Sequence, residues 1–121
     1  MSDGKSMTVQ DLKAFLDAFN RHDADTIAES FTEDGAFETV RENKRVTGKA
    51  ELREYFAKMF EKIQDVHFGG DAHFVDGDRG LSEWRMTGTE ASGERLDMRG
   101  CDVFTFREGK ILKKDSYLKQ T

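Results

Sequence analysis

One carboxylate is conspicuous in this chain because of the residues that alternate with it. Every second position of one segment carries Leu96, Met98, Gly100, Asp102, Phe104 and Phe106. Side chains two residues apart in a strand share one face, so we expect Asp102 in the middle of an apolar face. Burial of an unpaired charge is costly, and the protein must therefore pair Asp102, protonate it or use it in chemistry.

The hairpin that follows this strand predicts the partner of Asp102. The segment Phe106–Lys110 suits a three-residue loop with Gly109 in the left-handed conformation and a bulge, which places Asp102 opposite Lys114. A two-residue loop would instead set Asp102 opposite Asp115, and two like charges that face each other are unfavourable. We therefore expect the first register.

Two roles for Asp102 follow from this register. An ion pair with Lys114 at ~4 Å and an effective dielectric of ~20 gains about 4 kcal/mol before desolvation, and would make Asp102 structural. If Lys114 extends to the rim instead, Asp102 is free for acid/base work.

The first half of the chain has the period of helices, and the second half has the period of strands. Helices are expected over Val9–Phe19, from Asp23 to Phe31 and from Gly48 to Ile63, with a turn at Thr32–Gly35, a short strand at Ala36–Val40 and a charged loop at Arg41–Arg45. Strands are expected at Val66–Val75, Gly80–Thr87, Glu94–Phe106 and Lys110–Leu118. This order predicts an α+β fold, with helices covering one face of a curved antiparallel sheet.

Length and composition narrow the class of protein. A chain of 121 residues is expected to form one domain over 1–121, with about residues 1–7 as a disordered tail. The net charge of −5 provides no basic patch for nucleic acid. The single cysteine, Cys101, can form no intrachain disulfide, and no apolar run approaches the ~20 residues that span a bilayer. With no signal-peptide pattern, we expect a cytoplasmic protein without a nucleic-acid or membrane partner.

Several short segments, taken in chain order, resemble one known family. They are Ala18–Asn20 with Asp23, Phe31–Glu38, Thr47–Leu52, Glu83–Trp84, Asp102–Phe104 and Gly109–Tyr117. Together they resemble the SnoaL-like branch of the nuclear transport factor 2-like superfamily. The resemblance implies a cystatin-like cone of three N-terminal helices packed on a curved, mostly antiparallel β-sheet. It indicates the fold far better than the activity.

The resemblance also excludes two standard mechanisms. The protonated acid of the ketosteroid isomerases aligns with Asp102, but the tyrosine that shares its oxyanion hole aligns with Phe15 and the general base aligns with Thr39. The limonene epoxide hydrolase pattern has no Arg-x-Asp motif near Glu83–Arg85, and its second acid aligns with Ser116. A cyclase-like mechanism needs the fewest catalytic groups, because one acid/base carboxylate in an apolar pocket could suffice.

A mostly apolar pocket is expected on the concave face of the sheet. Its predicted lining is Phe15, Phe19, Phe37, Thr39, Ser82, Trp84, Met86, Met98, Phe104 and Leu118, with Asp102, Lys114 and Ser116 among them. A few polar groups in an apolar pocket are typical of a small-molecule site. The alternative is that the aromatic side chains fill the cone and leave no cavity.

No cofactor or metal ion is expected. His67 and His73 are an even number of residues apart on one predicted strand, so we expect them on the same face, together with Asp65 and Asp71. A metal site needs three or four ligands at a fixed geometry, whereas these residues are spread along an extended chain. We interpret them as solvated polar residues of a strand.

These patterns lead to two hypotheses about function. The first is a cofactor-independent acid/base enzyme, of an isomerase, cyclase or dehydratase kind, that acts on a small apolar substrate with Asp102 as acid or base and Lys114, Ser116 and Thr39 in support. The alternative is a non-catalytic ligand-binding or dimerisation module. An enclosed cavity that exposes Asp102 would favour the enzyme, whereas a filled cavity or a direct pair of Asp102 with Lys114 would favour the module.

The opposite face of the sheet is expected to be an interface. It carries Cys101, Val103, Ile111 and Tyr117 among charged residues. Relatives in the superfamily often dimerise through this surface, and apolar side chains left uncovered there would be a liability. We therefore expect a homodimer through the outer sheet face.

Overall fold

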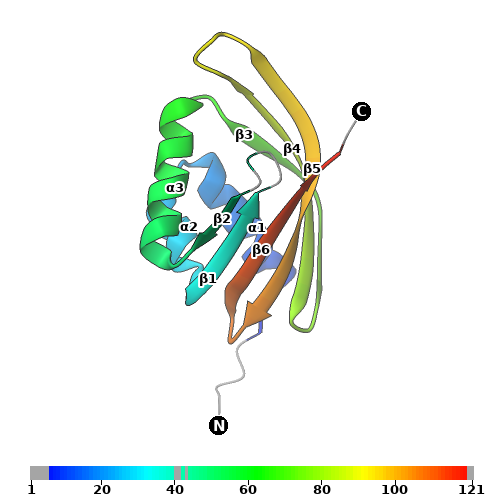
Figure 1. Cartoon of the computed structure of the whole chain (residues 1–121). Helices are drawn as coiled ribbons and strands as arrows, with labels where there is room; N and C mark the ends of the chain where they lie inside the picture. Colours follow the sequence, from blue (N-terminus) through cyan, green and yellow to red (C-terminus); the bar gives the residue numbers. More distant parts are fainter. Residues whose placement is uncertain (1–5, 40–41, 43, 120–121) are drawn as a thin grey trace.

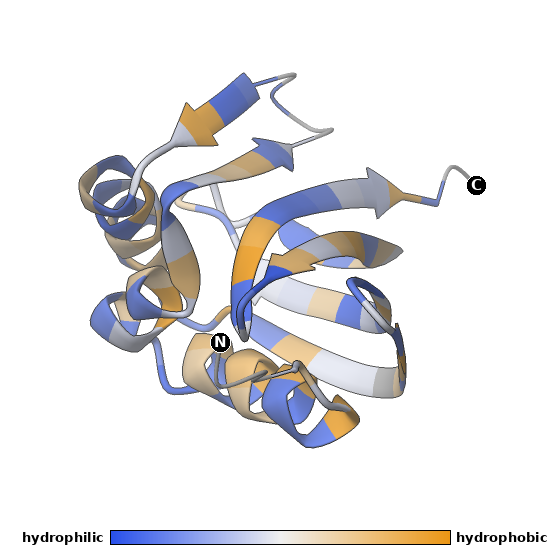
Figure 2. Ribbon diagram, turned by 90° about the horizontal axis from the view of Figure 1, so that it is seen from below, coloured by the Kyte–Doolittle hydropathy of each residue, from blue (hydrophilic) through white to orange (hydrophobic). Residues whose placement is uncertain are grey.

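Three helices pack against one face of a single curved sheet (Figure 1). The structure is a computed structural model that describes residues 6–39, 42 and 44–119. The helices are α1 (Val9–Asn20), α2 (Ala24–Glu29) and α3 (Lys49–Lys62). Seen from below, the sheet curves around the space that the helices border (Figure 2). None of the helices among the described residues is long and apolar enough to cross a bilayer.

The sheet has six strands in the order β2-β1-β6-β5-β4-β3. Their bounds are β1 (Phe31–Thr39), β2 (Lys44–Thr47), β3 (His67–Asp76), β4 (Arg79–Thr89), β5 (Arg95–Arg107) and β6 (Lys110–Leu118). Only the pairing of β1 with β6 is parallel among the described strands. The predicted α+β cone with a mostly antiparallel sheet is therefore confirmed.

The first helix forms as its sequence predicts. Thr8 and Asp11 make a capping box, in which each side chain accepts from the backbone N–H of the other residue. The buried stripe of α1 consists of Leu12, Phe15, Ala18 and Phe19. Residues 1–5 of the expected tail lie outside the described residues, whereas Met7 is buried against the core. The helix therefore presents one apolar face to the cone.

The prediction for residues 31–47 was partly wrong. Phe31 belongs to β1 rather than to the second helix, because its ring is fully buried and it pairs with Ile111 of β6. The predicted turn at Thr32–Gly35 is an irregular part of β1, where the register with β6 shifts. The strand β2 was not predicted, since a polar segment with only Val46 buried gives little periodic signal.

The β5–β6 hairpin also differs from the predicted register. A two-residue turn at Glu108 and Gly109, both at positive φ, joins Arg107 to its partner Lys110. Such a turn matches the twist of the strands. Leu112 is then bulged out of the ladder between two paired positions. The predicted three-residue loop was wrong.

The bulge decides which groups meet. Asp102 lies opposite Ser116, not opposite Lys114 or Asp115, and Phe104 lies opposite Lys114. The register differs from the predicted one by two residues, so Lys114 still shares the concave face with Asp102 as its diagonal neighbour. Because the bulge reverses the parity at Leu112, Ile111 is buried in the core rather than exposed on the outer face.

A second bulge changes the position of the two strand histidines. The register between β3 and β4 shifts between Gly70 and Ala72. As a result His67 is exposed opposite Thr87, whereas His73 lies opposite the buried Ser82. The two histidines therefore do not share a face.

Candidate functional site

Three polar side chains form a buried cluster on the concave face, and we call Asp102, Ser116 and Lys114 the polar triad. The Ser116 hydroxyl donates to Asp102 Oδ1 at 2.5 Å. The Lys114 ammonium donates to the same oxygen at 3.2 Å and to Ser116 Oγ at 3.1 Å. All three residues are buried, with Asp102 and Lys114 each 6% exposed. Asp102 and Lys114 are thus directly paired.

The Lys114 ammonium lies in an aromatic environment. Its Nζ is 4.2 Å from the centroid of the Phe37 ring and 5.4 Å from that of Phe19. The negative faces of such rings attract a cation. Burial nevertheless lowers the pKa of Lys114 below its ordinary value, although the neighbouring Asp102 carboxylate opposes this shift. Deprotonation of this amine is therefore easier than that of an exposed lysine.

Beside the triad is a small cavity of about 20 Å³. Its lining consists of Leu12, Phe15, Leu16, Phe19, Phe68, Ser82, Trp84, Asp102, Phe104 and Lys114. This volume is close to what one water molecule needs and far below the ~300 Å³ of a drug-sized site. The aromatic side chains fill most of the cone, as the alternative prediction for the pocket proposed.

The predicted site residues fall into two groups. Seven line the cavity: Phe15, Phe19, Ser82, Trp84, Asp102, Phe104 and Lys114. Six do not: Phe37, Thr39, Met86, Met98, Ser116 and Leu118. Phe37 still contacts the Lys114 ammonium, but the Thr39 hydroxyl accepts from the backbone N–H of Glu42 at the end of β1. Thr39 therefore makes no hydrogen bond with the triad.

Three lining residues were missing from the predicted pocket. Leu12 and Leu16 extend from α1, whose apolar stripe was visible in the sequence. Phe68 lies opposite Met86 on the neighbouring strand, and the pairing of β3 with β4 would have identified it. The sequence alone did not show which face of α1 and which face of β3 point toward the polar triad.

His73 was interpreted as a solvated strand residue, and this was wrong. Its Nδ1 lies 2.8 Å from Ser82 Oγ. Partial burial, together with the nearby Lys13 ammonium, lowers the pKa of His73 below its usual value. Across the sheet His73, Ser82, Asp102 and Ser116 occupy directly opposite positions on four neighbouring strands. They form a polar row under α1.

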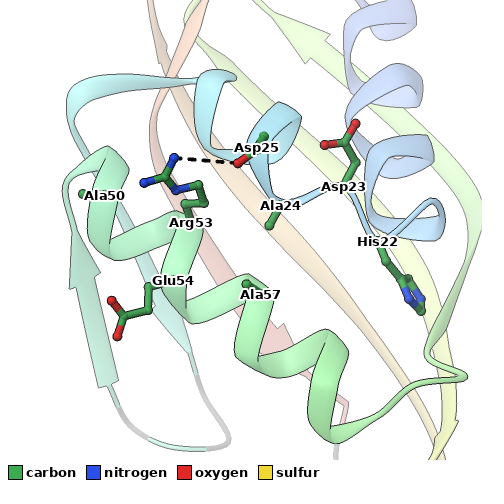
Figure 3. Close-up of a pocket in the computed structure, with 8 residues that line it drawn as sticks. All are labelled: His22, Asp23, Ala24, Asp25, Ala50, Arg53, Glu54 and Ala57. Atoms are coloured by element: carbon green, nitrogen blue, oxygen red, sulfur yellow. Dashed lines mark ion pairs between the residues drawn. The ribbon is translucent and has the colours of Figure 1, made fainter.

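A larger groove lies at the surface between α2 and α3 (Figure 3). Its volume is about 540 Å³, and it is lined by His22, Asp23, Ala24, Asp25, Ala50, Arg53, Glu54 and Ala57. Arg53 pairs with Asp25 at 3.8 Å, and both side chains are exposed. His22 occupies the predicted interhelical turn and stacks on Phe60. Because the groove is open and charged and shares no residue with the cavity beside the triad, it is not the predicted apolar site.

Solved structures share this fold. A protein with a ketosteroid isomerase-like fold from Catenulispora acidiphila, solved with trimethylamine, is 17% identical with a TM-score of 0.82 over 88% of this chain and 82% of its own. Bal32a from a soil-derived mobile gene cassette is 23% identical with a TM-score of 0.81, covering 90% and 86%. The epoxide hydrolase/cyclase-like enzyme SalBIII of salinomycin pyran ring formation is 24% identical with a TM-score of 0.78, covering 90% and 88%.

The fold is therefore the nuclear transport factor 2-like, ketosteroid isomerase-like cone of these solved structures. The model of the SnoaL-like domain family matches residues 12–113, which is most of the chain. The chain therefore belongs to the SnoaL-like family. No curated protein matches it.

Proposed function

We propose that this protein binds a small, mostly apolar molecule inside the cone, and that the polar triad recognises an oxygen-containing group of that molecule. The observation that carries the proposal is that Asp102, Lys114 and Ser116 are buried and hydrogen-bonded to one another in an otherwise apolar cone. Stability alone gives little reason for such a cluster, because apolar replacements of a buried ion pair are often neutral or stabilising by about 1–4 kcal/mol.

Binding requires the cone to open. The cavity of about 20 Å³ has no room for a ligand larger than a water molecule. One helix, α1, supplies Leu12, Phe15, Leu16 and Phe19 to its wall. A ligand that moves these four side chains enlarges the cavity and stabilises a minor conformation, as in other concealed pockets.

Acid/base catalysis by Asp102 is the second candidate. The 2.5 Å contact between Ser116 Oγ and Asp102 Oδ1, together with the lowered pKa of Lys114, favours it, because it places three proton-exchanging groups side by side. The ion pair argues against it, since proton uptake by Asp102 would leave a buried ammonium without its counter-ion. Binding without catalysis is therefore the first proposal. The activity of SalBIII indicates that this fold also supports enzymes.

The triple substitution Asp102→Leu/Lys114→Met/Ser116→Ala tests whether the triad serves recognition or stability. We expect its free energy of unfolding in urea to equal or exceed that of the natural chain, by up to about 4 kcal/mol. Ligands that stabilise the natural chain should no longer stabilise this variant. A loss of about 3–5 kcal/mol would show that the triad is structural and would contradict the proposal.

A substitution at Asp102 alone separates binding from catalysis. Asp102→Asn keeps the shape and one hydrogen-bond acceptor but removes the acid/base group. For any ligand that binds, loss of its conversion with retained binding would make the protein an enzyme. If the natural chain leaves the bound ligand unchanged, the binding function stands.

A further inference from the structure

The single tryptophan of the chain holds a buried hydrogen-bond donor. Trp84 is 6% exposed, and its Nε1 is the one buried side-chain nitrogen or oxygen without a hydrogen-bond partner among the residues described. A buried donor left without an acceptor costs about 1–3 kcal/mol. An acceptor from outside the chain would remove this cost.

The cavity beside the triad has room for such an acceptor. Trp84 lines it, and its volume of about 20 Å³ exceeds the ~10–15 Å³ that one water molecule requires. Gly100 lies opposite Trp84 and leaves space for the indole, since a Cβ at this glycine would come within 2.7 Å of the ring. The indole is thus held against β5 at the edge of the cavity.

Two further polar groups border the same space. All hydrogen bonds that Asp102 receives within the described part of the chain fall on Oδ1, so Oδ2 has an unused acceptor site. Ser82 lies directly opposite Asp102 and contacts His73 through its hydroxyl. An oxygen atom in the cavity can accept from Trp84 and donate to Asp102 or Ser82. This meets the two to four partners that a buried water needs.

We propose that the cavity is a binding site for one oxygen atom, held by the indole N–H of Trp84 and occupied by a water molecule in the ligand-free protein. This water connects the His73–Ser82 pair to the polar triad and completes a hydrogen-bonded row across β3, β4, β5 and β6. If the proposed ligand-binding function holds, a carbonyl or hydroxyl oxygen of the ligand replaces this water.

The single indole N–H resonance of the natural chain tests the site without any ligand. In a rotating-frame NMR experiment we expect a cross-peak between the indole proton and water with the sign of a dipolar contact, which is opposite to that of proton exchange. Absence of this cross-peak, or a peak with the sign of exchange alone, would overturn the proposal. Either result leaves ligand binding in the cone to be judged by its own experiment.

Two substitutions locate the water. Ser82→Val places a methyl group in the cavity and removes the hydroxyl, so the dipolar cross-peak should disappear. Met86→Leu changes a buried side chain two residues from Trp84 on β4, outside the cavity lining, and keeps every polar group, so the cross-peak should remain. A cross-peak that persists in a folded Ser82→Val variant would place the water elsewhere and overturn the proposed site.

Discussion

At the scale of single residues, the charges of Lys114 and Asp102 depend on each other. Both side chains are buried inside the cone. The 3.2 Å ion pair between Lys114 Nζ and Asp102 Oδ1 brings each charge into contact with its counter-ion. Removal of one partner leaves the other charge buried without a counter-ion, which is far more costly than loss of an exposed pair. Neighbouring residues on β6 should therefore differ sharply in their response to substitution.

The first prediction compares two lysines of β6. Lys114→Met should lower the free energy of unfolding by about 3–5 kcal/mol, because Asp102 is left buried and unpaired. Lys113→Met is the matched control, since the Lys113 side chain is 37% exposed and pairs with Glu38 at 3.5 Å on the outer face. Its effect should stay within about 1 kcal/mol. Equal effects of the two substitutions in urea denaturation would contradict the account.

The second prediction concerns alkaline pH. Burial lowers the pKa of Lys114 in the folded state below its ordinary value of 10.5. Between these two pKa values the unfolded chain binds more protons than the folded one, so the free energy of unfolding rises with pH across this window. Below the folded-state pKa the contribution of Lys114 is constant.

The control for this pH dependence is the double substitution Asp102→Leu/Lys114→Met. Urea denaturation at several alkaline pH values gives the free energy of unfolding of both proteins. The value for the natural chain minus that for the variant should increase with pH. A difference that falls as the pH approaches 10.5 would mean that the pKa of Lys114 is raised in the folded state.

At the scale of elements, two β-bulges decide what the site contains. The bulge at Leu112 brings Ser116 opposite Asp102 and keeps Lys114 on the same face. The shift between Gly70 and Ala72 turns His73 toward Ser82. A one-residue insertion in a strand reverses the facing of every side chain beyond it, so such bulges have large consequences for a site.

This explains how much the sequence could predict. Hydrophobic periodicity was sufficient for α1 and α3, for the last four strands and for the buried face of Asp102, but it extended the second helix to Phe31, which begins β1. It could not locate bulges, because a bulge depends on how the turn at Glu108–Gly109 and the ladder fit together. It also missed β2, whose four residues include one buried side chain. His73 was misjudged for the same reason. The prediction assumed that side chains alternate regularly from His67 to His73, whereas the bulge between Gly70 and Ala72 places the two histidines on opposite faces.

The third prediction tests the close approach of β5 to Trp84. A Cβ at Gly100 would lie 2.3 Å from the carbonyl oxygen of Tyr117 and 2.7 Å from the Trp84 ring. Gly100→Ala should therefore lower the free energy of unfolding by about 1–3 kcal/mol. Gly69→Ala is the control, because its nearest neighbour would be 3.8 Å away. Thermal unfolding followed by circular dichroism measures both, and a Gly100→Ala variant as stable as the control would contradict the packing.

At the scale of the whole molecule, the outer face of the sheet carries two exposed aromatic side chains, Phe74 and Tyr117. Tyr117 is 50% exposed there and lies opposite Cys101, with ion pairs such as Arg85–Asp97 farther along the face. We predict a homodimer through this surface, which light scattering would record as two chains of 13.8 kDa each. Tyr117→Glu should yield the monomer, whereas Lys58→Glu, on the exposed side of α3 and away from the outer sheet face, should not. A monomeric natural chain at micromolar concentration would contradict this prediction.

Thermal shift with paired fragments tests the central claim most directly. Each pair consists of a small cyclic ketone or phenol and its hydrocarbon counterpart, such as 1-tetralone and tetralin. We predict that oxygen-bearing members raise the melting temperature of the natural chain more than their hydrocarbon counterparts do. We also predict that the triple variant Asp102→Leu/Lys114→Met/Ser116→Ala removes this difference. No stabilisation of the natural chain across the panel, or equal stabilisation by both members of every pair, would contradict recognition of an oxygen group by the polar triad.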